Sequence, residues 1–413
     1  MKHLVITFFA LLFCSATWAQ TTAGQLLASA WDDPAVQLHR EQQAYLEATD
    51  FNMPLLRKLE IRTESRDLDP KQQEYALRIG TNGFGMKRTQ SAIYGSMKEL
   101  TEAERQMLVQ EALLDRYELL LDVHFTRQTL GLLERQRQVL LDKKAVFSQQ
   151  LALGLQEDLD DLFRTEDDLL QLERKIFEAK SDATVQRFRL KIFTEKEDTV
   201  MADKLITPAE ILLFVGSVTG NGAAIPASIR RRAAQAELAL QEEKMNQMEF
   251  RNLLNYLQFR YTGNANDLLE DRFSVGAGFD LPWPNGSKLK QQELHLETLK
   301  SQAETEAERQ KMEQAVQLKS NQWAQLVERY DFLEKQAADF RQAYDPQRLH
   351  ASGLENPETL LRVQESLARL DLEMASVERD IYRNYLSLLG ETGLLTQEPA
   401  RNYLSPGLEL IPR

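Results

Sequence analysis

The sequence predicts a mainly helical protein with a small β part, built from one duplicated unit of a helix, a β-hairpin and a long helical hairpin. Charged residues make up 27% of the 413 residues, whereas glycine and proline number only 18 and 12, which is typical of long helices. Two stretches alternate apolar and polar residues on both sides of a turn, as the strands of a hairpin do. The same order of elements then occurs twice along the chain.

The first 19 residues have the features of an export signal. Lys2 precedes a short apolar run, and Thr17 and Ala19 lie at positions −3 and −1 of a signal-peptidase cut before Gln20. The run is shorter than the roughly 20 residues that a membrane-spanning helix needs, and no later stretch reaches that length. Cys14, the only cysteine, lies in this segment without the small neighbours of a lipidation site. We therefore expect an exported chain that has no disulfide and no transmembrane helix.

Composition excludes several classes of function. The net charge of −13 argues against nucleic acid as a partner. Five scattered histidines, without any His/Cys cluster, argue against a metal site. The sequence has no nucleophile motif, no glycine-rich phosphate loop after a strand and no paired catalytic carboxylates. We therefore expect neither an enzyme nor a cofactor.

The first repeat begins with a helix and a hairpin. Apolar residues spaced among charges predict one helix over 25–52, which Pro54 ends. Two alternating runs then flank a polar turn over 65–73, which predicts two strands of one hairpin. The apolar positions of this hairpin are Leu59, Ile61, Tyr75, Leu77 and Ile79.

A long helical hairpin follows, with a turn at Gly154. The outgoing helix is expected over about 87–153, and the returning helix starts near three aspartates, which suit a helix N-terminus. Leucines and other apolar residues recur every seven positions in both helices, which is typical of a coiled-coil seam. In the outgoing helix these are Leu132, Val139, Val146 and Leu153, and in the returning helix Leu162, Leu169, Ile176, Ala183 and Leu190.

The second repeat lies about 198 residues further along the chain. A segment over 196–225, rich in glycine, is expected to be a linker or a small equatorial subdomain, and helices are expected over 228–252, 287–344 and 358–389. The last residues, 392–413, are expected to be an irregular tail. The second hairpin has its apolar positions at Phe259, Tyr261, Phe273, Val275, Phe279 and Leu281. The heptad of the first returning helix recurs, at one constant offset, as Leu360, Leu367, Met374, Ile381 and Leu388.

We expect the mature chain to be one domain, 20–413, made of two repeats over about 20–195 and 226–391. Four strands cannot close into a barrel around a lumen, and open sheet edges cannot exist in lipid. Therefore either the strands lie in water and another part of the protein covers them, or several chains share one barrel. An apolar outer face and a charged inner face fit a water-filled pore. The residues expected to face lipid are Leu59, Ile61, Tyr75, Leu77, Ile79, Phe259, Tyr261, Phe273, Val275, Phe279 and Leu281.

The chain resembles the TolC family of outer-membrane efflux and secretion ducts. The likeness rests on the duplicated order of elements, on the stretch FSVGAGFDLPWPNGSK and on two Gly-Leu turns. It implies a homotrimer whose twelve strands form one barrel in the outer membrane, above a coiled-coil tunnel in the periplasm. It also implies a passive conduit that an inner-membrane pump drives, and a periplasmic adaptor that docks at Gly154, Leu155, Gly353 and Leu354.

Alternatives remain open at this stage. Gly154 and Gly353 either belong to a docking site for an adaptor or only end helices. The aspartates after the first turn either gate the tunnel or only stabilise a helix N-terminus; they are Asp158, Asp160 and Asp161. The alternative function is a soluble periplasmic coiled-coil interaction protein, with the hairpins as a small covered sheet.

Overall fold

The computed structural model describes residues 22–49, 56–65, 73–82, 84–153, 159–194, 204–220, 225–251, 254–263, 268, 272–279, 287–345 and 357–412. Several predictions of the sequence analysis lie outside these residues. They concern the signal peptide over 1–19 and the residues Gly154, Leu155, Asp158, Leu281, Gly353 and Leu354.

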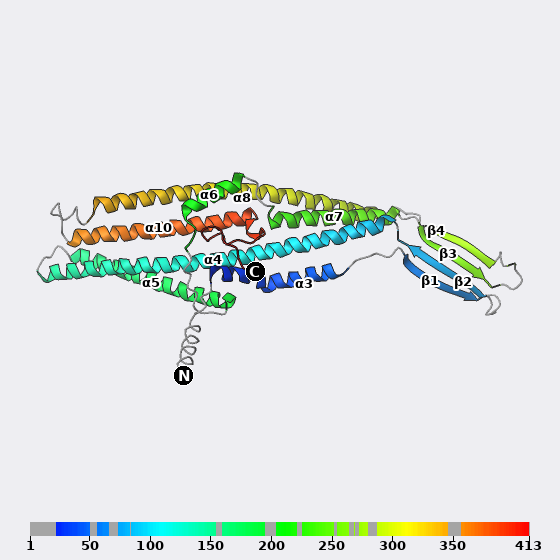
Figure 1. Cartoon of the computed structure of the whole chain (residues 1–413), viewed down its shortest axis with the longest axis horizontal. Helices are drawn as coiled ribbons and strands as arrows, with labels where there is room; N and C mark the ends of the chain where they lie inside the picture. Colours follow the sequence, from blue (N-terminus) through cyan, green and yellow to red (C-terminus); the bar gives the residue numbers. More distant parts are fainter. Residues whose placement is uncertain are drawn as a thin grey trace, which may run out of the picture. The chain divides into compact units, whose positions relative to one another are not determined.

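The predicted order of elements is confirmed (Figure 1). The first repeat contains α2 (Ala23–Ala28), α3 (Pro34–Ala48), β1 (Leu56–Ser65), β2 (Gln73–Thr81), α4 (Phe84–Ala152) and α5 (Leu159–Thr194). The second contains α7 (Ala227–Arg251), β3 (Leu254–Thr262), β4 (Phe273–Phe279), α8 (Ser287–Ala343) and α10 (Pro357–Glu391). None of the described helices combines the length and the apolar character that a membrane crossing requires.

One local prediction is wrong. The single helix expected over 25–52 is broken, because α2 passes into the 3₁₀-helix η1 (Ser29–Asp32) and α3 begins only at Pro34. Asp33 is extended there, with ψ of 131°, as expected for a residue before proline. The segment over 196–225, expected to be a linker or a small subdomain, contains the helix α6 (Pro208–Gly220), at whose start the Thr207 backbone N–H donates to Glu210.

The chain forms two compact units. The first consists of Met1–Asp33, Val109–Ala224 and Gln314–Arg413, and the second of Pro34–Leu108 and Ile225–Glu313. Each unit draws on both sequence repeats, and α4 and α8 contribute residues to both units. The prediction of one domain made of two repeats therefore stays a prediction.

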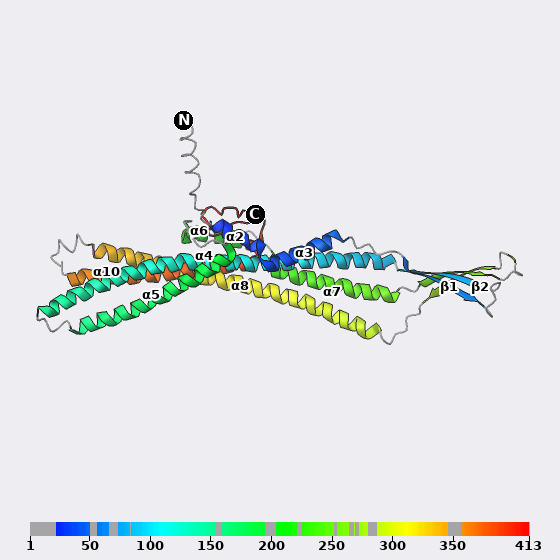
Figure 2. The ribbon, with the colours of Figure 1, turned by 90° about the horizontal axis from the view of Figure 1, so that it is seen from below.

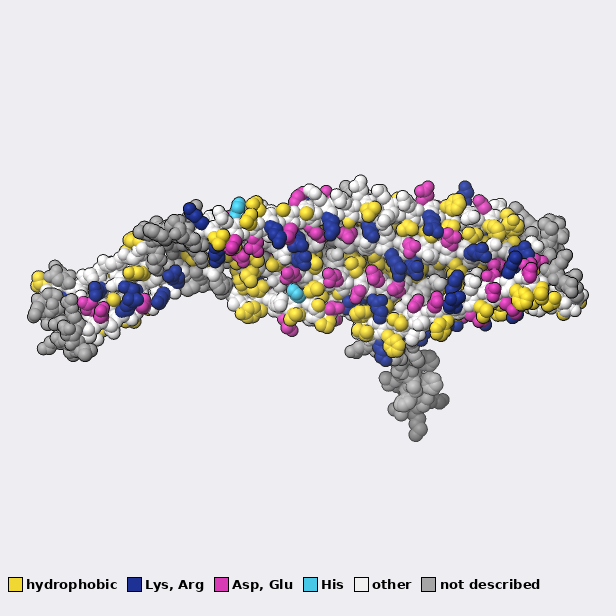
Figure 3. Space-filling model, turned by 180° about the vertical axis from the view of Figure 1, so that it is seen from behind, with side chains coloured by type: hydrophobic (Ala, Val, Ile, Leu, Met, Phe, Trp, Pro, Cys, Tyr) yellow, Lys and Arg dark blue, Asp and Glu magenta, His cyan; other side chains and the backbone are white. Residues whose placement is uncertain are grey.

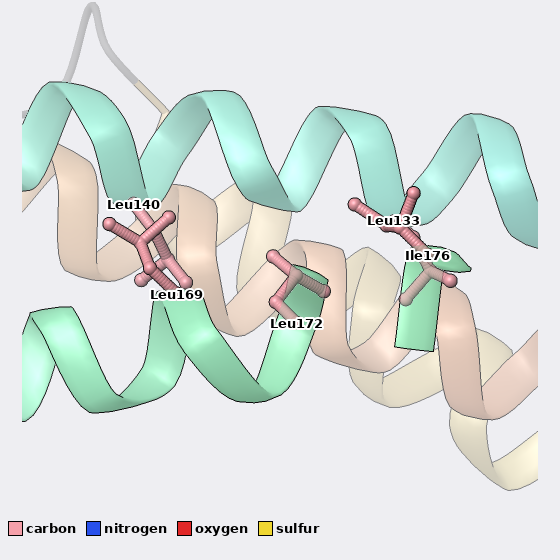
Figure 4. Packing of buried hydrophobic residues seen from close by; sticks show 5 residues of the cluster. All are labelled: Leu133, Leu140, Leu169, Leu172 and Ile176. Carbon is pink, nitrogen blue, oxygen red and sulfur yellow. The ribbon is translucent and has the colours of Figure 1, made fainter. Parts of the chain in front are cut away.

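In the first unit, α4 and α5 pack through a seam of leucines. Figure 4 shows Leu133 and Leu140 of α4 directed toward Leu169, Leu172 and Ile176 of α5, and all five are buried. Figure 2 shows the two helices side by side. The heptad predicted on α5 is thus confirmed at the two positions that lie in this seam.

The heptad predicted on α4 is wrong by one residue. The buried positions are Leu133, Leu140 and Phe147, whereas Leu132, Val139 and Val146 are only half-buried and Leu153 is exposed. A second helix also packs on α4, because Lys143 pairs with Glu365 of α10 at 3.0 Å and Leu372 of α10 contacts the leucine seam. Two neighbours bury a wide face of α4, so a single heptad does not describe its packing.

The tail over 392–413 has little regular structure, as predicted, but it is packed into the core of its unit. Tyr403 is buried and donates from its hydroxyl to the Leu394 carbonyl at 3.0 Å. The Tyr117 hydroxyl of α4 donates to the Arg401 carbonyl at 3.0 Å and accepts from the Tyr403 backbone N–H at 3.1 Å. These bonds fix the tail to α4 over a long separation in sequence.

Candidate functional site

The four described strands form one antiparallel sheet in the order β1-β2-β3-β4 (Figure 1). Each hairpin pairs its own two strands, and β2 pairs with β3, so that the sheet joins the two repeats. The register places Leu77 opposite both Ile61 and Phe259, and Phe259 opposite Val275. Because side chains alternate along a strand, this register decides which residues share a face.

One face of the sheet is apolar. Three rows cross it: Thr63, Tyr75, Tyr261 and Phe273; Ile61, Leu77, Phe259 and Val275; and Leu59, Ile79, Leu257 and Ala277. The chain itself leaves much of this face uncovered, since Ile61 is 72% and Val275 71% exposed. An exposed apolar face of this kind marks a contact with lipid or with another protein.

The opposite face of the sheet is polar and charged. Arg62 donates to Glu60 at 2.8 Å, and Arg78 donates from Nε to Gln258 Oε1 at 2.6 Å. Arg260 pairs with Glu74 across β2 and β3. Figure 3 shows Lys, Arg, Asp and Glu side chains grouped over the strands. Such a face suits water, and these side chains are paired with one another.

β4 presents only small residues to this charged face, namely Ser274, Gly276 and Gly278. Gly278 is required, because a Cβ there would collide with the ring of Tyr256 on β3. The Arg78 guanidinium lies over the same ring, 4.6 Å from its centroid. The glycine thus allows the aromatic ring to lie across the strand beneath the arginine.

Both outer strands of the sheet keep a free edge among the described residues, because β1 pairs only with β2 and β4 only with β3. β1 is ten residues long, and every residue except the half-buried Glu60 is exposed. A long open edge with an apolar face is a template for pairing with another strand.

The structure brings together most of the residues predicted to face lipid. Ten of the eleven lie on the apolar face or continue its alternation along β4; Leu281 is the one outside the described residues. The register adds Leu257 and Ala277 to this face, which the same alternation of apolar residues could have indicated. Contact with lipid itself stays a prediction.

The predicted gate residues that are described lie at the start of α5. Asp160 and Asp161 both fall in its first turn, where carboxylates interact favourably with the helix dipole. Asp161 also lies 3.8 Å from Arg164 and 3.8 Å from Arg362 of α10. Arg362 therefore connects the returning helices of the two repeats, a contact that the sequence analysis did not predict. This geometry suits a structural role, and a gating role stays a prediction.

No group of three or more His, Cys, Asp or Glu side chains in the described part of the chain is arranged to hold a metal ion. The polar groups of the sheet are paired with one another rather than directed at one point. The arrangement can line an aqueous surface, but it offers no set of convergent groups for chemistry.

In the described chain, a sheet with one apolar face alternates in sequence with long helices. The chain matches no protein-family model, and no curated protein sequence matches it. Among solved structures it is similar to the outer-membrane channel CmeC of Campylobacter jejuni, with 10% identity and a TM-score of 0.60 over 90% of this chain and 84% of that one. It is also similar to the outer-membrane protein VceC of Vibrio cholerae, with 13% identity and a TM-score of 0.62 over 90% and 96% of the chains.

A third similar structure is the outer-membrane channel MtrE of Neisseria gonorrhoeae, with 14% identity and a TM-score of 0.59 over 90% and 88% of the chains. At these identities the likeness concerns the fold. The chain therefore shares the fold of these outer-membrane channels, which confirms the predicted mainly helical fold with two hairpins between long helices.

Proposed function

We propose that this chain is the outer-membrane channel of a tripartite efflux or type I secretion system. It would be a passive conduit from the periplasm to the exterior. The observation that carries this proposal is the sheet, which has one apolar face, one charged face and two open edges. Its fold, which is that of outer-membrane channels, supports the same function.

If the sheet lies in a bilayer, its open edges favour an assembly in which several copies pool their strands. Within a bilayer an unpaired backbone N–H or C=O has no water to bind, so an open edge is costly there. If β1 of one copy pairs with β4 of the next, every edge is satisfied and the sheet closes. Three copies give twelve strands, which lies within the range of membrane barrels. We therefore propose a homotrimer with its barrel in the outer membrane and its helices in the periplasm.

In this assembly the apolar face contacts lipid and the charged face lines the lumen. Arg62, Arg78 and Arg260 of each copy then point toward the passing solute, together with Glu60 and Glu74. Rings of charged side chains bias which ions and solutes pass. The described lumen residues are mixed in sign, which suits a conduit for varied solutes rather than a selective filter.

The partners remain part of the proposal. A periplasmic adaptor would dock at the helical tips, at Gly154, Leu155, Gly353 and Leu354, and an inner-membrane pump would supply the energy. The contact of Asp161 with Arg362 supports a role of the first turn of α5 in holding the tips together. A gate of Asp158, Asp160 and Asp161 is tested by the conductance of their asparagine variants.

The full chain, expressed with its export signal, provides the test. We expect it in the outer-membrane fraction, and we expect the purified oligomer to produce stepwise conductance in a planar lipid bilayer. A monomer in the soluble periplasmic fraction, without conductance, would instead support the alternative of a coiled-coil interaction protein.

A further inference from the structure

α8 and α10 enclose a polar groove in the first unit. Arg329 of α8 pairs with Glu373 of α10 at 2.8 Å, and the Asn384 side chain of α10 donates to Gln322 of α8 at 3.4 Å. These contacts place the two helices antiparallel and side by side (Figure 1). The groove between them has a volume of about 530 Å³, and we call it the α8–α10 groove.

Four charged side chains line this groove among the described residues, and two of them are already paired. Arg329 has its partner on α10, and Arg383 pairs with Asp122 of α4 at 2.7 Å. Lys319 and Asp380 form no ion pair, either with each other or with any other residue that the structure describes. The groove therefore keeps one cation and one carboxylate available for a ligand.

These two available charges come from opposite walls of the groove. Lys319 lies on α8 and is half-buried, whereas Asp380 lies on α10 and is exposed. The remaining polar lining consists of three amides, Gln322, Gln325 and Asn384, each of which has donors and an acceptor. An ammonium group donates to a carboxylate in a charge-assisted hydrogen bond, so each wall offers a site for one end of a ligand.

The signs of these charges indicate what kind of ligand fits. A ligand that carries only negative charge would be repelled by Asp380, and one that carries only positive charge would be repelled by Lys319. A zwitterion meets an opposite charge at both ends. Peptide groups between its ends would find the donors and acceptors of the amides that line the groove.

The other side of α10 is covered by the rest of the first unit. The Tyr382 hydroxyl donates to the Ile206 carbonyl, and the ring centroid of Tyr385 lies 6.2 Å from that of Phe214 in α6. Both tyrosines are buried, whereas Asp380 lies roughly 150° around the helix axis from each of them. Figure 2 shows α6 and the end of the chain on the same side of the long helices.

This arrangement decides which side of α10 would face the lumen of a conduit. A lumen has to stay open along its length, and segments that cross the long helices would obstruct it. In the proposed assembly α6 and the C-terminal tail therefore lie outside, and the α8–α10 groove lies on the lumen side.

We propose that the α8–α10 groove is a binding site for a zwitterionic solute of the size of a short peptide. Lys319 binds the carboxylate of this solute and Asp380 binds its ammonium group. The inference rests on the proposed function, to which it adds a class of exported solute. A site inside a conduit has to bind its solute weakly enough to release it, and two ion pairs in an open groove meet this condition.

Isothermal titration calorimetry of the membrane-extracted oligomer of the full chain tests the site. The probe is triglycine, which carries one charge of each sign at its ends. Two matched ligands keep one charge each, namely N-acetyl-triglycine with its carboxylate and triglycine amide with its ammonium group. We expect triglycine to bind saturably, at one site for each copy, and about fivefold more tightly than either matched ligand.

Single substitutions assign the two ends of the ligand. Lys319→Gln should weaken triglycine binding about fivefold and leave triglycine amide unaffected, whereas Asp380→Asn should weaken triglycine equally and leave N-acetyl-triglycine unaffected. Lys319→Arg keeps the charge and should keep the affinity. The matched control is Lys335→Gln, which removes a lysine from an exposed position of α8 about 24 Å away and should leave binding unchanged. Melting temperatures equal to that of the unsubstituted protein show that the variants are folded.

Equal affinities of the unsubstituted protein for the three ligands, or no saturable binding of triglycine, would overturn the site whatever the variants do. A conducting oligomer with this result would leave the proposed channel intact. Triglycine binding by an oligomer that does not conduct would support the site and contradict the channel.

Single-channel recordings in a planar lipid bilayer test the place of the groove in the lumen. Triglycine at its dissociation constant should lower the current through the unsubstituted channel and should not lower the current through the Lys319→Gln variant. Binding in calorimetry without any change in current would overturn the placement of the groove in the lumen.

Discussion

Replacing Phe259 with glutamate places a carboxylate in the middle of the apolar face. Phe259 lies between Leu77 and Val275 in the central row, and its strand partners are paired on both sides. In the proposed barrel, a central position along strands of seven to ten residues lies near the middle of the bilayer. A charge on the lipid face of a barrel costs up to about 2–4 kcal/mol at the midplane, and somewhat less for a carboxylate than for a cation.

We take a cost of about 2 kcal/mol for each glutamate on the lipid face. Because 1.4 kcal/mol corresponds to a factor of ten, the equilibrium constant for assembly in the membrane should fall roughly 30-fold for each copy that carries Phe259→Glu. The assay is the amount of oligomer in the outer-membrane fraction and its melting temperature in detergent. The matched control is Gln258→Glu, which adds the same charge one residue away on the other face, where Arg78 can pair with it. Equal insertion of both variants would refute the assignment of the two faces.

Three further predictions concern the helical part. Leu172→Ala empties a buried position between α5 and α4 and should lower the free energy of unfolding by about 2–5 kcal/mol in denaturant titrations, whereas Lys175→Ala, on the exposed side, should change it little. Tyr403→Phe removes one of the two donors to the Leu394 carbonyl, which keeps the Gln397 backbone N–H at 3.1 Å, and should cost about 0.5–1.5 kcal/mol, with faster proteolysis of the tail; unchanged proteolysis would show that this bond does not fix the tail. Burial raises the pKa of the Glu378 carboxyl, so its ionisation destabilises the fold: the stability that it contributes is complete below pH 4.5 and is lost as the pH rises through the raised pKa. Glu378→Gln should remove this pH dependence in melts from pH 4 to 8, and a retained dependence would assign it to other groups.

The sequence predicted the elements whose signal is periodic. Alternation in two hairpins and heptads in the returning helices survive in the structure, because a half-buried strand or helix must keep its apolar residues on one side. The same alternation predicts, without the strand register, that Phe259 and Val275 lie on one face of the sheet. The alternation of residues cannot predict that β2 pairs with β3, because these strands lie about 180 residues apart in the sequence.

The parts that were missed depend on tertiary contacts. The burial of Leu133 in place of Leu132 follows from two helices packing on α4, which a single heptad cannot express. The packing of the tail depends on hydrogen bonds between Tyr117 and residues more than 280 positions away. The helix α6 begins with a cap at Thr207, whose hydroxyl accepts from the Glu210 backbone N–H. A threonine followed three residues later by a glutamate is a sequence signal for the start of a helix, so this helix could have been predicted.

Hydrogen exchange of the β1 and β4 backbone amides tests the central claim most directly, namely that separate copies complete each other's sheets. In a single chain the backbone amides on the free edges of β1 and β4 have no partner strand among the described residues. In the membrane-extracted oligomer we expect them to be protected as strongly as the amides of β2 and β3, and to lose this protection when the oligomer is dissociated. Rapid exchange at both edges of the intact oligomer would contradict the shared sheet.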